Sequence, residues 1–87
     1  MTTIYLCKDG DSVTHTFMTE KEAKDCCDSM NRQQANRNIL AAVGVPEAML
    51  NRPRDYHRYN DAFSFTYEDV NAELANVSKY TVVQQTV

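Results

Sequence analysis

Cysteine and histidine side chains are the groups in this chain best suited to chemistry. They belong to Cys7, Cys26, Cys27, His15 and His57. A structural zinc site takes its ligands from spaced pairs such as Cys-x-x-Cys, and adjacent cysteines do not give that spacing. A cysteine nucleophile needs a neighbouring base and an orienting group. His15 on the hairpin could approach the helix cysteines if both line the same sheet, but nothing in the spacing requires it. We therefore expect no metal site and no enzyme, and a small thiol enzyme is only the third hypothesis for the function.

The cysteines also bear on the redox compartment. Their number is odd, two are adjacent, and Met1–Tyr5 has neither the basic region nor the apolar stretch of an export signal. Because disulfides are rare in the cytoplasm, we expect a cytoplasmic protein with three reduced thiols and no structural disulfide. No apolar run approaches the roughly 20 residues of a membrane-spanning helix, so we expect no membrane partner.

Carboxylates and glycines give no sign of a cofactor site. The adjacent acids Glu68 and Asp69, and the two acids that flank Gly10, are typical of a helix cap and a turn. The chain has only one other glycine, Gly44, so it contains no glycine-rich loop to cradle phosphates. We expect no cofactor.

Residues 52–59 have the composition of a binding surface, since Arg and Tyr most often anchor contacts with partners. The candidates are Arg52, Arg54, Tyr56, His57, Arg58 and Tyr59. A proline interrupts the segment and its residues are too polar for a core, so we expect it to lie at the surface. Replacing Arg54, Tyr56 and Arg58 with Ala should then leave the fold intact.

Two kinds of partner fit this segment. Arg can neutralise phosphates and Tyr can stack on bases, which makes direct nucleic-acid binding the alternative hypothesis. The net charge of −3 opposes it, because a dedicated nucleic-acid binder is usually basic. A protein partner, which Arg and Tyr serve equally well, is favoured. A third interpretation is that these side chains simply pair with the chain's own acids.

Acidic side chains indicate a second charged surface on the predicted hairpin turn and first helix. Its members are Asp9, Asp11, Glu20, Asp25 and Asp28. All five Arg fall within residues 32–58 and all four Lys outside that range, an asymmetry that can mark interaction surfaces. An acidic face could meet the nucleic-acid-binding groove of another protein by electrostatic complementarity. The partner would then be a protein or a protein–nucleic-acid complex.

Four segments have the alternating or β-branched pattern of strands. Residues 2–8 and 12–18 flank a turn at Gly10 and predict an N-terminal hairpin. Residues 62–67 predict a third strand, and residues 80–87, which carry no charge, a fourth. An exposed edge of that composition would invite pairing with another chain, so we expect the last strand to be internal to the sheet or a homodimer contact.

A principal helix should follow the hairpin. Thr19 and Glu22 fit the Thr-x-x-Glu capping box that opens a helix. An apolar stripe at helical spacing should pack on the hairpin: Ala23, Cys26, Cys27 and Met30. The polar run 31–38 either extends this helix or forms a loop.

Helical signals also fill the middle of the chain. An apolar run ends at Gly44, a typical helix stop, and Pro46–Leu50 predicts a short helix with Pro at its first position. From Thr66 onward a short helix is favoured over a strand, because Thr66 and Asp69 mimic a capping box.

These elements predict a single domain, residues 1–87, of the α+β class. Its small antiparallel sheet combines the N-terminal β-hairpin with C-terminal strands and is packed by one principal helix, with a helical middle insertion. The chain places the hairpin at Ile4–Phe17 before a helix start at Thr19–Ala23 and an aromatic segment at Phe63–Val70. This layout resembles small orphan proteins of bacteriophages and related mobile elements. The resemblance implies a stoichiometric inhibitor of a host protein or defence complex in the host cytoplasm, and it carries no site residues because the class shares no motif.

Overall fold

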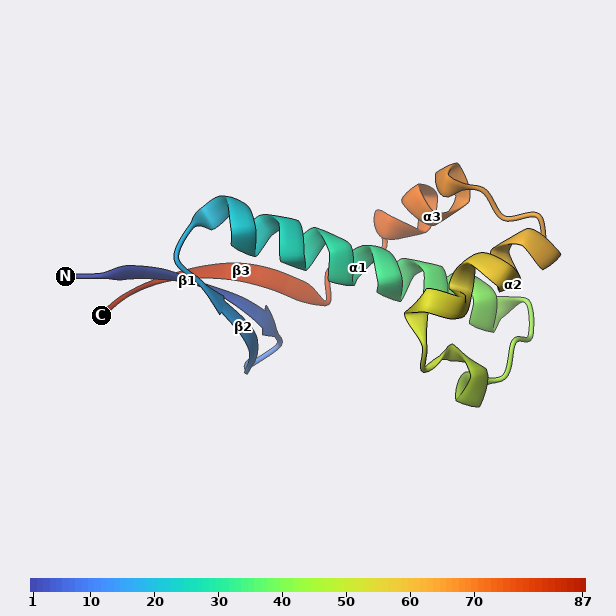
Figure 1. The fold of residues 1–87 in the computed structure, drawn as a ribbon, viewed down its shortest axis with the longest axis horizontal. Coiled ribbons are helices and arrows are strands. Elements are labelled where there is room, and N and C mark those ends of the chain that lie inside the picture. The colour runs from blue at the N-terminus through green and yellow to red at the C-terminus, as the bar shows by residue number, and fades with distance from the viewer. The chain divides into compact units, whose positions relative to one another are not determined.

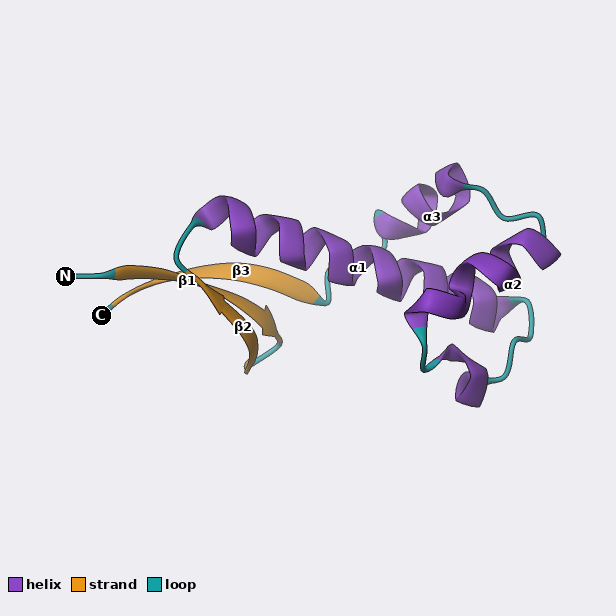
Figure 2. Cartoon of the chain, in the orientation of Figure 1, coloured by secondary structure: helices purple, strands orange, loops and turns teal.

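The computed structural model describes residues 1–87, which form two compact units. Residues 1–31 and 78–87 make up the first unit, and residues 32–77 make up the second. The elements labelled in Figure 1 and coloured by type in Figure 2 are β1 (Thr3–Asp9), β2 (Ser12–Phe17), α1 (Glu20–Ala42), the 3-10 helices η1 (Glu47–Leu50) and η2 (Pro53–Asp55), α2 (Tyr56–Ala62), α3 (Tyr67–Leu74) and β3 (Tyr80–Thr86). The antiparallel sheet and the long helix that packs on it confirm the α+β class. That residues 1–87 form one domain stays a prediction.

The sheet of the first unit has three strands in the order β2-β1-β3, with both neighbours antiparallel to β1. Gly10 turns the hairpin at φ 61°, in the left-handed region that glycine adopts without strain. The hairpin and the final strand are therefore confirmed. The final strand is an edge of the sheet rather than an internal strand, because only β1 pairs with it.

The N-terminal half of α1 covers one face of this sheet (Figure 2). Thr19 opens the helix as predicted: its hydroxyl oxygen accepts the Glu22 N–H at 3.3 Å and its O–H donates to Glu22 Oε1 at 2.8 Å. Of the predicted apolar stripe, Ala23 and Cys27 are buried, whereas Cys26 and Met30 are half-buried. The stripe therefore packs mainly through Ala23 and Cys27.

The expectation of three reduced thiols is wrong. Cys7 on β1 and Cys27 on α1 form a disulfide with their Cα atoms 6.0 Å apart, a separation that suits such a bridge. Only Cys26 is free. Counting and spacing could not reveal the pairing, because the packing of α1 on the sheet brings together cysteines that are 20 residues apart. Since disulfides persist in oxidising compartments, the argument from reduced thiols no longer supports a cytoplasmic location, which stays a prediction.

The core of the second unit forms where α1 ends and the chain turns back. Its buried members are Leu40, Val45, Leu50 and Tyr56, with Ile39, Tyr59 and Phe65 packed against them. The polar run 31–38 continues α1 as a helix, and Ala35 within it is fully buried. Gly44 ends this stretch at φ 99°, and the Val45 N–H then donates to the Leu40 carbonyl oxygen at 3.1 Å. The short helix after Pro46 is confirmed as η1.

The predicted strand at residues 62–67 is wrong. The Phe63 N–H donates to the Tyr59 carbonyl oxygen and the Phe65 N–H to that of Asn60, so the segment closes the end of α2. Thr66 then caps α3 with the full capping box to Asp69, as the helical alternative predicted. The capping box determines the conformation of Thr66 locally. Residues 62–67 have no neighbouring strand that could supply the hydrogen bonds a strand needs.

Candidate functional site

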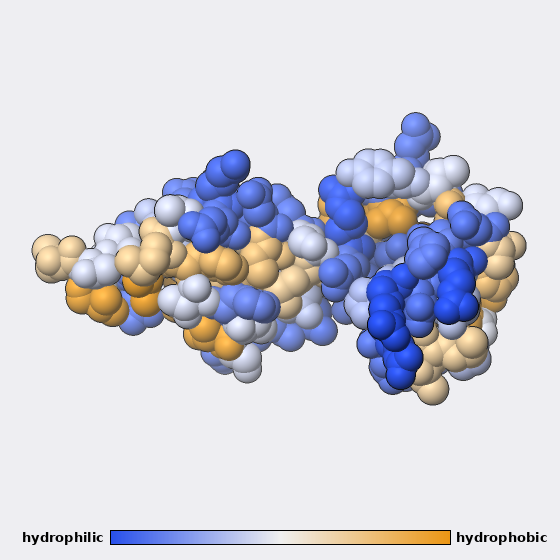
Figure 3. Space-filling model, viewed as in Figure 1, coloured by the Kyte–Doolittle hydropathy of each residue, from blue (hydrophilic) through white to orange (hydrophobic).

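The predicted binding segment, residues 52–59, folds as η2 followed by the first turn of α2. Arg52, Arg54, His57 and Arg58 are exposed, so the prediction of a surface position is confirmed for these four. We call these four residues the arginine surface. Figure 3 shows strongly hydrophilic side chains gathered over α2 and the segment that precedes it.

Tyr56 lies in the core, so the prediction that it is a surface residue is wrong. Its side chain is 5% exposed, and its phenol donates a hydrogen bond to the Leu50 carbonyl oxygen at 2.6 Å. Tyr59 is half-buried against the same core. The two tyrosines are three residues apart, which places them on one face of a helix. The spacing of Tyr56 and Tyr59 was the signal in the sequence that both side chains face the core. Pro53, just before them, obscured the helix.

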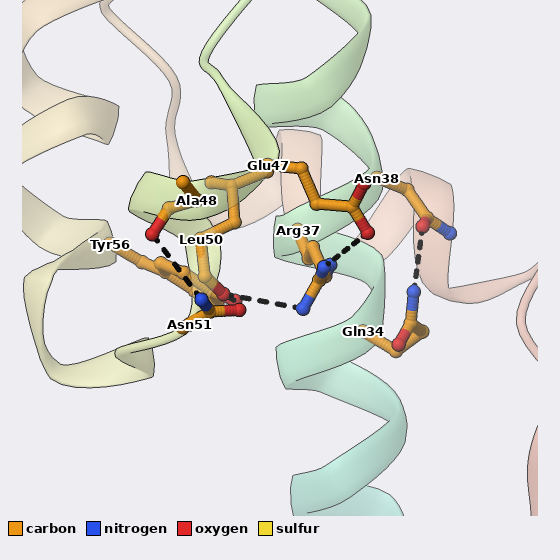
Figure 4. A network of polar contacts seen from close by, with 8 residues as sticks. All are labelled: Gln34, Arg37, Asn38, Glu47, Ala48, Leu50, Asn51 and Tyr56. Carbon is orange, nitrogen blue, oxygen red and sulfur yellow. Dashed lines mark hydrogen bonds and ion pairs between the residues drawn. The ribbon is translucent and has the colours of Figure 1, made fainter.

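Arg37 joins α1 to η1, the 3-10 helix that precedes the arginine surface (Figure 4). Its Nη2 lies 3.0 Å from Glu47 Oε1, and its Nη1 donates to the Leu50 carbonyl oxygen at 3.4 Å. Burial raises the pKa of the Tyr56 phenol, and nearby Arg37 opposes that shift. Tyr56 thus remains a neutral donor at physiological pH, and the segment that carries the arginines is held by a satisfied polar network.

Ion pairing leaves most of the arginine surface unneutralised. Arg58 Nη2 lies 3.6 Å from Asp55 Oδ1, on a side chain that is 72% exposed, and such a pair adds little stability. Arg52 and Arg54 form no ion pair. The His57 Nδ1 lies 2.7 Å from the Arg54 carbonyl oxygen, and a carbonyl can only accept, so Nδ1 carries the hydrogen and fixes this turn. The interpretation that these side chains pair with the chain's own acids therefore holds for Arg58 alone.

The predicted acidic residues all belong to the first unit, but the structure spreads them over both ends of its sheet. Asp9 ends β1 opposite Tyr80, the residue that bonds Asn31 on α1. Glu20 instead begins α1, next to the other end of β2. Lysines also interrupt the acidic set, since Lys24 pairs with Glu20 at 2.7 Å and Lys79 lies 3.8 Å from Asp9.

Asp11, Asp25 and Asp28 are exposed and form no ion pair. Asp25 and Asp28 are three residues apart on α1 and so share a face of that helix. Asp11 lies in the hairpin turn. A single continuous acidic face is therefore not formed, and a binding role for these residues stays a prediction.

The imidazole of His15 lies on β2, stacked on Phe17 with the ring centroids 6.0 Å apart. Its Nδ1 is 3.2 Å from the Thr14 hydroxyl. The free thiol of Cys26 contacts Met30, Sγ to Sδ, at 3.7 Å. No three Cys, His, Asp or Glu residues cluster in a way that could hold a metal ion. No helix has the length and apolar character needed to span a bilayer.

Sequence reasoning missed a cavity of about 300 Å³ in the second unit, between α1, α2 and the start of α3. Figure 3 shows the hollow between α2 and α3, with hydrophobic atoms at its floor. Arg32 and Asn36 from α1 and Asn60 from α2 line it. Arg32 and Asn36 belong to the polar run 31–38. The composition of that run fits a solvated helix as well as a cavity wall, and only the fold shows which of the two it is.

Comparison with protein-family models, curated proteins and solved structures found no match for this chain.

Proposed function

We propose that this chain is a non-catalytic domain that binds an acidic surface of a partner protein through the arginine surface. The observation that carries the proposal is that Arg52 and Arg54 are exposed and form no ion pair, although the segment that bears them is fixed in place. A guanidinium on a rigid base loses less freedom on binding than one on a mobile loop. Carboxylates of a partner would form forked, charge-assisted hydrogen bonds with it.

The burial of the tyrosines favours a protein over a nucleic acid. Stacking on bases needs an exposed aromatic face, but Tyr56 is buried and Tyr59 packs against the core. The arginines are left without the platform that would let them hold a single strand. The net charge of −3 also repels a polyanion at a distance.

Stoichiometric docking of this kind is also how an inhibitor of a host protein or defence complex would act. That role is the one implied by the bacteriophage-like layout, and it requires no catalytic residue. A bound domain that covers an acidic functional surface blocks it sterically and by charge.

A pair of matched variants tests the proposal. The variant Arg52→Ala with Arg54→Ala removes two charges from the arginine surface, and Lys21→Ala with Lys24→Ala removes two exposed charges from α1. After capture and identification of a partner, we expect the arginine variant to bind it about 30-fold more weakly, as at an interface hot spot worth about 2 kcal/mol. The lysine variant should bind within about twofold of the unmodified chain.

Equal loss in both variants, or none in either, would contradict the proposal. So would tight, salt-sensitive binding of the purified chain to DNA or RNA at about 0.15 M salt, which would establish the nucleic-acid alternative. Circular dichroism should show the same helix content for both variants, because all four side chains are exposed.

A further inference from the structure

Arg32, on the wall of the cavity in the second unit, is a half-buried cation with no counter-ion. Its Nη1 donates to Asn71 Oδ1 at 2.7 Å, and its guanidinium lies 4.7 Å from the centre of the Tyr67 ring. Both contacts orient the guanidinium and neither neutralises it, since no acid forms an ion pair with it. Arg37, also half-buried, does pair with an acid, Glu47. Because a charge removed from water interacts more strongly, an anion in this cavity would gain from Arg32.

Two amides on the same wall have unused donors. Asn36 and Asn60 bond each other reciprocally, Nδ2 to Oδ1, at 2.8 and 2.9 Å. Each amide nitrogen carries two N–H groups, so each residue keeps one for another acceptor. Arg32 likewise has N–H groups beyond the one that Asn71 accepts. The polar side of the cavity therefore offers a positive charge and several donors.

The other side of the cavity is apolar. Val70 is 6% exposed and Phe65 is half-buried against the core, and both line the cavity. Small-molecule sites combine such an apolar wall with a few polar groups that fix orientation, and their volumes begin at about 300 Å³.

From this arrangement we propose that the cavity binds a carboxylate attached to a small apolar group. The carboxylate accepts the forked N–H groups of Arg32 and an amide N–H of Asn36 or Asn60, and the apolar group covers Phe65 and Val70. One negative charge matches the one uncompensated guanidinium. Asp61 is also a wall residue, and it would repel a phosphate, which carries close to two charges near pH 7, more strongly than a carboxylate with its single charge.

Such a group has two sources, a small organic acid or the C-terminal carboxylate of a peptide. The probes are 3-phenylpropanoate and acetyl-Gly-Gly-Phe, each compared with its uncharged amide. Of the arginine surface, only His57 lies on the cavity wall. The proposal does not depend on the docking function, because Arg52 and Arg54, the residues that carry that function, do not line the cavity.

Nuclear magnetic resonance titration of the nitrogen-15-labelled full chain tests whether the cavity binds a carboxylate. At least one of the two carboxylates should shift the side-chain amide signals of Asn36 and Asn60 and bind about tenfold more tightly than its amide, because the amide lacks the charge that Arg32 recognises. Binding of only the phenylpropanoate identifies a small acid as the source, and binding of only the peptide identifies a C-terminus. Inorganic phosphate should bind more weakly than the preferred carboxylate.

Two variants test whether Arg32 is the residue that binds the carboxylate. Arg32→Gln should weaken carboxylate binding about tenfold, whereas Lys21→Gln, which also removes one positive charge but at an exposed site on α1, should weaken it less than about twofold. Equal binding of acid and amide, absence of binding by both acids, or equal loss in the two variants would overturn the proposal. The comparison of acid with amide uses the unmodified chain, so it decides the question even if Arg32→Gln does not fold.

Discussion

The carbonyl oxygen of Leu50 accepts hydrogen bonds from two side chains, the Tyr56 phenol and the Arg37 guanidinium. Tyr56 comes from the start of α2 and Arg37 from α1, so this one oxygen ties the end of η1 to both helices. Buried polar groups are tolerated where they are hydrogen-bonded, and here two donors share one acceptor. The arginine surface therefore begins at Arg52, two residues after a fixed point of the core.

Two substitutions of Tyr56 should separate the contribution of its packing to stability from the contribution of its hydrogen bond. We expect Tyr56→Ala to lower the free energy of unfolding by about 3–5 kcal/mol, the cost of a large cavity. Tyr56→Phe should cost only about 1 kcal/mol, because Arg37 still donates to the Leu50 oxygen. Urea denaturation followed by circular dichroism measures both. The control Arg54→Ala should lie within about 0.5 kcal/mol of the unmodified chain, and equal stability of Tyr56→Ala would place the ring outside the core.

Alkaline pH should also act through Tyr56. Burial raises the pKa of its phenol against the smaller opposing effect of Arg37, whereas in the unfolded chain this pKa returns to about 10. A folded pKa above the unfolded one means that the protonated phenol contributes stability fully below about pH 10 and loses it as the pH rises through the folded pKa. We expect the free energy of unfolding to fall more steeply above about pH 10 in the unmodified chain than in Tyr56→Phe. Parallel pH profiles would contradict this.

At the scale of the elements, the bridge between Cys7 and Cys27 joins the central strand to the helix that covers it. Cross-linking residues 20 positions apart restricts the unfolded chain and should stabilise the fold by about 3 kcal/mol. We expect one free thiol per denatured chain before reduction and three after it. Cys27→Ser should lose as much stability as reduction does, whereas Cys26→Ser should lose little. Three free thiols before reduction would restore the prediction made from the cysteine count.

Local signals predicted those elements that local chemistry determines. Gly10 indicated the hairpin turn, and the pairs Thr19–Glu22 and Thr66–Asp69 marked two helix starts, because turns and caps are satisfied within a few residues. Residues 62–67 have the alternation of a strand, but a strand also needs a neighbour, which the sequence does not specify. Composition likewise identified the exposed arginines of the candidate site, whereas the inward face of Tyr56 and the cavity around Arg32 depend on tertiary packing.

At the scale of the molecule, the second unit is an insertion into the first. The chain leaves the first unit at residue 31 and returns at residue 78. Within the first unit, Asn31 pairs with the first residue of β3: its Nδ2 donates to the Tyr80 carbonyl oxygen at 3.0 Å, and its Oδ1 accepts the Tyr80 N–H at 2.9 Å. One amide side chain thus completes an extra hydrogen-bonded pair at the start of β3.

The open edge of β3 should support self-association. The strand carries no charge along Tyr80–Thr86, and beyond Tyr80, whose backbone groups bond Asn31, no second strand pairs with its outer edge. Lysine at such an edge is the usual protection against pairing. We expect sedimentation velocity to show a dimer whose fraction increases with protein concentration, and Val83→Lys to abolish it. Val13→Lys, on the opposite edge strand, should leave it unchanged. A monomer at all concentrations would contradict a contact through β3.

The two ends of the chain are hydrogen-bonded to each other, Thr2 N to Val87 O at 2.8 Å and Val87 N to Thr2 O at 2.7 Å. A force that pulls the ends apart would load this pair first and then the β1–β3 pairs one after another, so the sheet would unzip rather than shear. The pull would then pass directly across the bridge from Cys7 to Cys27, two residues 20 positions apart, and the loop between them would bear no load. At about 3.5 Å per residue, and with 6.0 Å between the bridged Cα atoms, the oxidised chain would extend about 65 Å less than the reduced one. Mechanical stretching would therefore report the redox state of the protein as a length.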